Sequence, residues 1–194
     1  MIQEMARITA EKMSDHRVIE SSTIHIYIYG LELLYATLVG IAVMIIISEV
    51  CKMRLFWVAY LAGFVPLRLL GGGYHAKTHL RCIFIFSTIY AIVVLIAKRY
   101  ILPERVLLIA CFVNLIIILF FSPIAAPNKP LREYQVAVNR RKSIIFGISN
   151  LVGCFVLVFL LNLHNQWINI YFAGSSMAGL SMLLAVAAKR KKMH

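Results

Sequence analysis

Acidic side chains are scarce in this chain of 194 residues, which has eight Asp and Glu against 20 Lys and Arg and a net charge of +12. No Asp or Glu occurs between Glu49 and Glu104. A catalytic triad made only of residues from that segment is therefore excluded, because its histidine would have no carboxylate partner. A dyad remains, and so does a triad completed from Glu32, Glu49 or a distant amide or carbonyl.

Cysteine is too sparse for a disulfide framework. Cys111 and Cys154 fall inside apolar runs, and Cys51 and Cys82 lie near the ends of others, so we expect four reduced thiols. A cleavable signal peptide is not visible, because residues 1–23 contain no uninterrupted apolar stretch. The first hydrophobic run is then expected to act as its own uncleaved insertion signal.

Apolar residues are in large excess, since 61% of the chain is hydrophobic against about 45–50% in a typical globular protein. The Lys and Arg residues lie mainly in short segments between apolar runs, not along a continuous basic face. Anionic lipid headgroups or an acidic peptide are therefore better candidate partners than nucleic acid. The composition predicts an all-α, polytopic integral membrane protein.

Six apolar runs predict about six membrane helices, because about 20 apolar residues cross the hydrocarbon layer. The predicted spans are 24–50, 55–70, 80–97, 106–121, 144–163 and 167–188. The second is short and is interrupted by Pro66 and Arg68, so a broken or re-entrant helix is the alternative to a full crossing. The three prolines Pro123, Pro127 and Pro130 predict a polar loop, which we expect to continue through Lys142.

We interpret residues 1–194 as a single membrane domain. Residues 1–23 place apolar side chains at helical spacing between charges, which suits an interfacial helix, with a solvated helix as the alternative. The apolar positions are Ile2, Met5, Ile8 or Ala6, and Met13. Residues 24–188 hold the transmembrane helices, and residues 189–194 form a basic tail.

The distribution of Lys and Arg predicts the orientation in the membrane, because cytoplasmic loops carry the excess. If all six runs cross, most of the 20 Lys and Arg residues fall on the side that holds both termini and the segment between the second and third runs. We therefore expect a multi-pass protein of the cell membrane, with both termini and this segment in the cytoplasm.

The segment from 68 to 82 is an island of polar and glycine residues between the second and third runs. It contains three consecutive glycines, Gly71, Gly72 and Gly73. Glycines adopt backbone conformations closed to other residues and leave N–H groups bare to receive an oxyanion. They are followed by His75, His79 and Cys82, residue types that serve as general base and nucleophile and also bind transition metals.

A dyad of His75 and Cys82 has a geometric requirement. On a continuous helix the seven-residue separation is an axial offset of about 10.5 Å, whereas proton transfer needs about 3 Å. His75 must then lie in a non-helical loop that folds back over the start of the third helix. Thr78 is a suitable N-cap for that helix, whose N-terminus, with Lys77 and Arg81, favours a thiolate at Cys82.

His79 competes with His75 as the base, because a residue three positions before Cys82 on one helix reaches the thiol directly. Another interpretation takes His75, His79 and Cys82 as ligands of zinc or copper with an open fourth position. The chain would then be a small membrane transporter or metal-handling protein. In the remaining interpretation the glycines only permit close helix packing, which leaves the cations crowded around this segment unexplained.

The island and the proline loop together resemble the accessory gene regulator protein B (AgrB) family, membrane cysteine peptidases of Gram-positive quorum-sensing systems. The resemblance rests on Arg68, Gly72-Gly73-Tyr74-His75 and Cys82, with Pro127-Asn128-Lys129-Pro130-Leu131 after the fourth run. It implies that His75 and Cys82 are the catalytic pair. The family often has an Asp in the proline loop where this chain has Ala125 or Ala126.

The resemblance also implies a substrate, a small propeptide with an amphipathic leader and an acidic C-terminal tail. Cleavage through an acyl-enzyme thioester at Cys82 would help to form a cyclic thiolactone or lactone peptide. Arg68 or the glycine N–H groups would stabilise the oxyanion. The cations expected to hold the acidic tail are Lys77, Lys129, Arg132, Arg140, Arg141 and Lys142, with a positive-inside anchor as the alternative role. We expect no cofactor or metal, and a homodimer in the lipid bilayer.

Overall fold

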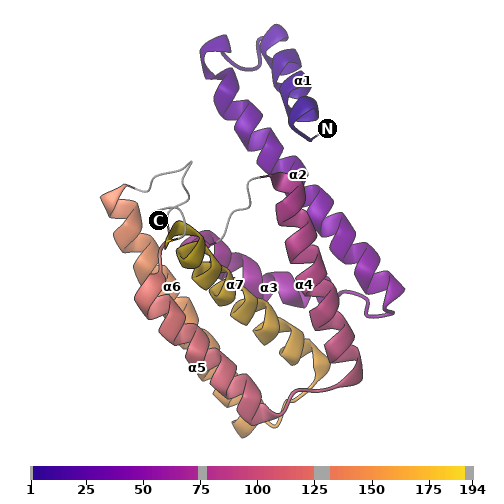
Figure 1. Ribbon diagram of the computed structural model, residues 1–194, viewed down its shortest axis with the longest axis vertical. Helices are drawn as coiled ribbons and strands as arrows, with labels where there is room; N and C mark the ends of the chain where they lie inside the picture. Colours follow the sequence, from indigo (N-terminus) through magenta and orange to yellow (C-terminus); the bar gives the residue numbers. More distant parts are fainter. Residues whose placement is uncertain (1, 74–77, 125–131, 191–194) are drawn as a thin grey trace.

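The computed structural model describes residues 2–73, 78–124 and 132–190, and these residues form an all-α protein, as predicted (Figure 1). The elements are α1 (Ile2–Asp15), the short 3₁₀ helix η1 (Ser21–Thr23), α2 (Ile24–Val50), α3 (Phe56–Gly71), α4 (His79–Arg99), α5 (Glu104–Phe121), α6 (Glu133–Cys154), its π-helical continuation η2 (Phe155–Leu160) and α7 (Gln166–Arg190). The predicted spans 24–50, 80–97, 106–121 and 167–188 agree with these helices to within two residues.

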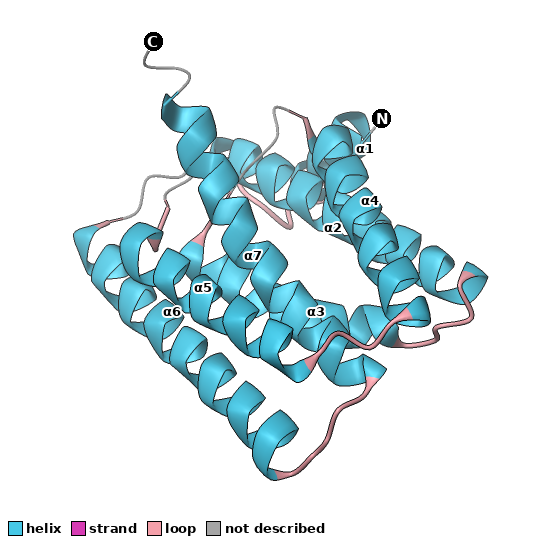
Figure 2. Cartoon of the chain, turned by 60° about the horizontal axis from the view of Figure 1, so that its bottom comes forward, coloured by secondary structure: helices cyan, strands magenta, loops and turns pink. Residues whose placement is uncertain are grey.

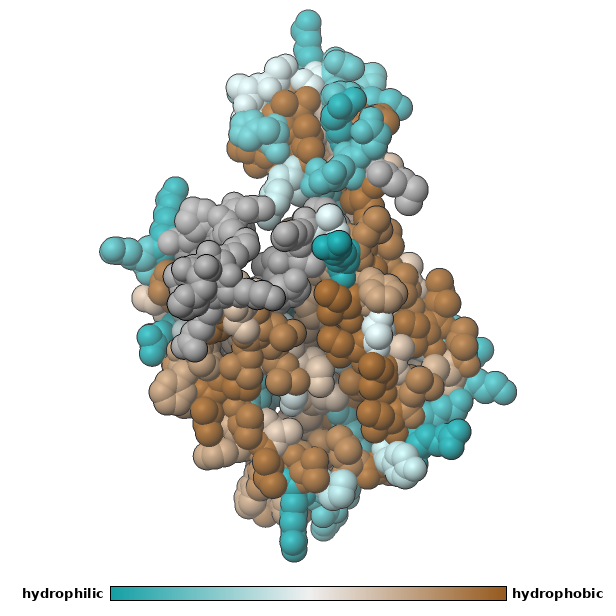
Figure 3. All heavy atoms as spheres, viewed as in Figure 1, coloured by the Kyte–Doolittle hydropathy of each residue, from teal (hydrophilic) through white to brown (hydrophobic). Residues whose placement is uncertain are grey.

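Among the described residues, five helices are long and apolar enough to cross a membrane, and α3 is a shorter apolar helix. Apolar side chains cover the body of the bundle, and hydrophilic residues gather over α1 and at the margins (Figure 3). Such a surface suits a hydrocarbon layer flanked by water. The chain is therefore a multi-pass membrane protein.

The helices pack in a small number of close pairs. α7 packs against α3 and α5, α5 packs against α6, and α2 packs against both α4 and α1. Figure 2 shows that α1 and the end of α7 lie on the same side of the molecule.

The path of α3 decides between a crossing and a re-entrant segment. At its start the Phe56 ring packs edge-on against Trp167, with ring centroids 4.6 Å apart, and at its end Gly71 lies against Met182. These contacts lie 15 residues apart along α7, so α3 runs beside α7 as one continuous helix, which favours a crossing over a re-entrant segment. We call these two ends of the bundle the Trp167 end and the Cys82 end, where α4 begins.

The alternative of a helix broken at Pro66 is wrong, since α3 continues through Pro66 to Gly71. Proline inside a helix removes one backbone hydrogen bond. Packing compensates here, because Phe64 and Leu67 on either side of the proline are both buried in the core.

The polar loop predicted to reach Lys142 is shorter than expected, because α6 begins at Glu133. The Arg132 backbone N–H donates to Gln135 Oε1 at 3.1 Å, which supports the first turn. No Pro or Gly occurs from there to Gly147. The helix that runs from α6 into η2 has 28 residues, or about 42 Å, which is longer than a hydrocarbon layer of about 30 Å. Its charged first turns are the part expected to extend beyond that layer.

α1 confirms that the N-terminal segment is a helix, and it packs against α2. Ile2, Ala6 and Ala10 are its buried residues, and Thr9 Oγ1 lies 3.0 Å from the Tyr35 hydroxyl of α2. Met5 and Ile8, two of the predicted apolar positions, are about half exposed. Small residues are buried because they let the two helices approach closely.

Glycines set the contact between α3 and α7. A Cβ atom placed on Gly63 would meet the backbone of Tyr171 and Ser175, and one placed on Gly174 would meet the backbone of Tyr60. The two helix backbones are therefore in direct contact, the type of packing that small residues permit in membrane proteins. This contact fixes where the end of α3 lies relative to α7.

Replacing Gly174 with alanine is expected to lower the free energy of unfolding by about 1–3 kcal/mol, because backbone atoms cannot move aside for the added methyl group. Gly40→Ala is the matched control, since a Cβ atom at Gly40 meets nothing within 4 Å and alanine favours the helix. Thermal unfolding of both variants in detergent tests this. Equal shifts in melting temperature would contradict the role assigned to the glycine contact.

Candidate active site

The structure describes only part of the predicted site. His75, Lys77 and Lys129 lie outside the described residues, as does the side chain of His79. Cys82 and Arg68 lie within them, as do Gly71, Gly72 and Gly73, which we call the glycine turn.

Cys82 lies in the first turn of α4 and is partly buried. The predicted N-cap is confirmed, because Thr78 Oγ1 accepts a hydrogen bond from the Arg81 backbone N–H at 3.3 Å. The Cys82 N–H donates to the Thr78 carbonyl at 3.2 Å. The thiol therefore belongs to the N-terminal turn, where the helix dipole favours a thiolate, and position 75 precedes this helix in the chain.

Aromatic pairs fix the register between α3 and α4. Tyr60 packs edge-on against Tyr90 with ring centroids 5.0 Å apart, and Phe64 packs edge-on against Phe86 at 5.3 Å. The two helices are therefore antiparallel here: four residues further along α3 corresponds to four residues earlier in α4. Residues four apart share a helix face, so the next position on each helix is Arg68 opposite Cys82.

Two further contacts agree with that register. The Arg68 guanidinium carbon lies 5.5 Å from the centre of the Phe86 ring, within the range of a cation–π contact. Arg68 also interacts electrostatically with Cys82. The structure therefore brings together two of the predicted site residues, a cation and a thiol, at the Cys82 end of the bundle.

The glycine turn holds the end of α3 against the segment that follows α5. The Ile124 backbone N–H donates to the Gly71 carbonyl at 2.9 Å, and Gly72 forms an isolated bridge with Ile124. Gly72 has φ +74°, a conformation that favours glycine. A side chain there would also meet the Ile124 carbonyl.

Gly73 is required for space as well as conformation. Its φ is +141°, and a Cβ atom there would meet both the Arg68 guanidinium and the Ser181 hydroxyl. Ser181, on α7, is buried and donates to the Ala178 carbonyl at 2.7 Å. The absence of a side chain at Gly73 therefore lets the Arg68 guanidinium and the Ser181 hydroxyl both lie next to this residue. That the glycine N–H groups receive an oxyanion stays a prediction.

Glu49 does not reach this site. It pairs with Arg54 at 3.2 Å in the turn before α3, whereas Arg68 lies near the other end of that helix. The 16 residues of α3 span about 24 Å. The alternative of a triad completed by Glu49 is therefore excluded by distance.

The predicted basic cluster lies at the Cys82 end, in and before the first turns of α6. Arg132, Arg140, Arg141 and Lys142 are all exposed. Since these turns are expected to extend beyond the hydrocarbon layer, we expect water or a charged ligand to reach the cations. Binding of an acidic tail there stays a prediction.

Two residues of the site region were missed in the sequence, Phe86 and Ser181. Phe86 had a usable signal, because it follows Cys82 by four residues and shares its helix face. Ser181 had none, since it lies on α7 and comes next to Gly73 only through the packing of α7 on α3.

Within the described part of the chain, no group of three His, Cys, Asp or Glu side chains is placed to hold a metal ion. The predicted ligand set includes His75 and His79, whose side chains fall outside that part. All four cysteines fall inside it, and no disulfide joins any two of them.

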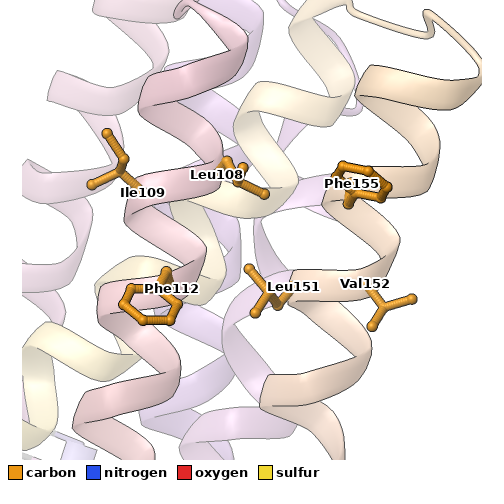
Figure 4. A pocket seen from close by; sticks show the side chains of 6 residues that line it. All are labelled: Leu108, Ile109, Phe112, Leu151, Val152 and Phe155. Carbon is orange, nitrogen blue, oxygen red and sulfur yellow. The ribbon is translucent and has the colours of Figure 1, made fainter.

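A groove away from Cys82 has no polar or ionisable residue in its lining. A groove of about 460 Å³ lies between α5 and α6 and is lined only by apolar side chains. Figure 4 shows these residues, which are Leu108, Ile109, Phe112, Leu151, Val152 and Phe155. A groove without a polar or ionisable group suits a lipid chain better than a reaction.

A model of the family described as Accessory gene regulator B (AgrB) matches residues 6–184, nearly the whole chain. No curated protein and no solved structure matches.

Proposed function

Because this chain belongs to the accessory gene regulator B family, which supports a role in processing a quorum-sensing propeptide, we propose that it is a cysteine endopeptidase of the cell membrane. Its nucleophile is Cys82 and its base is His75. The observation that carries the proposal is the position of Arg68 opposite Cys82, at the N-terminus of α4. A cation and a helix N-terminus next to one thiol are the surroundings of a reactive cysteine.

In the first step His75 takes the proton from the Cys82 thiol, and the sulfur attacks the scissile carbonyl carbon of the propeptide. Arg68, with N–H groups of the glycine turn, stabilises the oxyanion. The C–N bond then breaks, and His75 returns the proton to the leaving amine. The products are an acyl-enzyme thioester and the released C-terminal tail.

In the second step a thiol or hydroxyl within the bound propeptide attacks the thioester carbonyl. The S–C bond to Cys82 breaks, the ring closes, and the proton of the attacking group returns to the Cys82 sulfur through His75. With a thiol as the attacking group the exchange is nearly isoenergetic. Exclusion of water protects the thioester from hydrolysis.

The position of the basic cluster supports a cytoplasmic site for this chemistry. The exposed cations of α6 lie at the same end of the bundle as Cys82, and the positive-inside rule assigns that end to the cytoplasm. An acidic tail on the leaving side of the scissile bond would bind these cations.

A peptide chloromethyl ketone tests the proposal, because a nucleophilic cysteine displaces its chloride and forms a stable thioether. In the protein reconstituted in liposomes, mass spectrometry is expected to find the adduct on Cys82. His75→Ala should slow its formation by about 10²–10⁴-fold, the contribution of a general base, and His79→Ala is the matched control. An adduct on another cysteine, or equal rates in the two histidine variants, would sink the proposed pair.

A further inference from the structure

A second groove begins next to the candidate site. It lies between α4 and α7, has a volume of about 440 Å³, and is lined by three residues of α4 and six of α7. The α4 wall consists of Ile85, Phe86 and Ile89, and the α7 wall includes Leu180, Ser181 and Leu184. This volume is within the range of small-ligand sites, about 300–1,000 Å³.

The groove is continuous with the site through one residue on each wall. Phe86 is the residue whose ring lies under the Arg68 guanidinium. Ser181 is the residue whose hydroxyl lies at the Gly73 turn. A chain bound at Cys82 can therefore enter the groove without leaving the protein surface.

The length of the groove corresponds to a short peptide. From Cys82 to Ile89 is seven residues along α4, or about 10.5 Å. An extended peptide advances about 3.3 Å per residue, so this distance accommodates about three residues. Every lining residue except Ser181 is apolar, so large apolar side chains fit the groove and charged ones do not.

The direction of the groove selects which part of the substrate it binds. Cleavage turns the leaving segment into a charged amine, which needs water, whereas the acyl segment stays attached to Cys82 until the ring closes. The groove runs from Cys82 along α4, away from the exposed cations of α6. The acyl segment is therefore its occupant.

We propose that the groove between α4 and α7 binds the three residues that precede the scissile bond, and that these residues have large apolar side chains. The proposal rests on the proposed function. It makes the groove the specificity determinant for the acyl side of the substrate. The groove between α5 and α6 differs in having no polar residue and no contact with the residues around Cys82.

Two tripeptide chloromethyl ketones test this, acetyl-Leu-Leu-Phe and acetyl-Ser-Ser-Gly, with the full-length protein in liposomes. Ala187→Phe adds a large side chain to the α7 wall. It is expected to slow Cys82 labelling by the apolar probe about 10–100-fold, as expected when a hydrophobic pocket loses its fit. Labelling by the polar probe is expected to change by less than about threefold. Each probe is compared with itself, so its partitioning into the bilayer cancels.

Ala42→Phe is the matched control, because Ala42 is an exposed residue of α2 outside the groove. Iodoacetamide labels the thiol without needing the groove, so its rate reports whether Cys82 stays reactive. Equal labelling of wild type and Ala187→Phe by the apolar probe would overturn the groove and leave the peptidase intact. Failure of all three reagents to label Cys82 in the wild type would instead reject the proposed nucleophile.

Discussion

The Cys82→Ala protein is expected to cleave its propeptide at least about 10⁴-fold more slowly than the wild type, because no other group can form the acyl-enzyme. Loss of a nucleophile abolishes the covalent route and leaves only the contribution of binding and oxyanion stabilisation. Cleavage is measured by the release of the C-terminal tail from the propeptide in liposomes.

Cys51→Ala is the matched control for this experiment. Cys51 is also partly buried, but it lies in the turn between α2 and α3, close to Glu49 and Arg54 and therefore at the Trp167 end. Its replacement is expected to leave cleavage within about twofold of the wild type, the small effect typical of a substitution outside a functional feature. Normal cleavage by the Cys82→Ala protein would rule out the whole covalent mechanism.

The second large effect is expected at Arg68. Arg68→Met removes both the positive charge opposite Cys82 and the donors that we propose bind the oxyanion, so kcat should fall by about 10²–10³-fold, the cost of losing one oxyanion donor. The rate of Cys82 alkylation by iodoacetamide at neutral pH should also fall, because a nearby cation favours the thiolate. Both rates can be measured on one preparation.

Arg68→Lys separates the two roles of the arginine. Lysine keeps the charge but lacks the planar fork of donors, so alkylation should stay near the wild-type rate while cleavage remains impaired. Arg54→Met, at the other end of α3 and largely exposed, controls for the loss of an arginine. If Arg68→Met cleaves as fast as Arg54→Met, Arg68 has no part in the reaction.

The sequence was sufficient for the elements with a strong periodic or capping signal. Apolar runs long enough to cross a bilayer predicted α2, α4, α5 and α7, because in hydrocarbon every backbone group of a span must be bonded within the helix. Thr78 predicted the start of α4, since a threonine before an apolar run is a common N-cap. The placement of Cys82 in the first turn follows from that cap.

Features that depend on contacts between distant segments could not be predicted. Pro66 made a broken helix one alternative for the second run, and the burial of α3 between its neighbours explains why the helix continues. The position of Ser181 next to Gly73 comes from the glycine contacts of α3 with α7.

The start of α6 was missed for a local reason. The charge cluster of Arg140, Arg141 and Lys142 resembles a polar loop, whereas the absence of Pro and Gly after Glu133 lets α6 include these residues.

The shortness of α3 has a consequence for the depth of the site. Its 16 residues cover about 24 Å, some 6 Å less than the thickness of a hydrocarbon layer of about 30 Å. If α3 starts level with its neighbours at the Trp167 end, the glycine turn and Arg68 lie below the headgroups, at the edge of the acyl-chain region. A thioester formed at that depth is sheltered from bulk water by the membrane as well as by the protein.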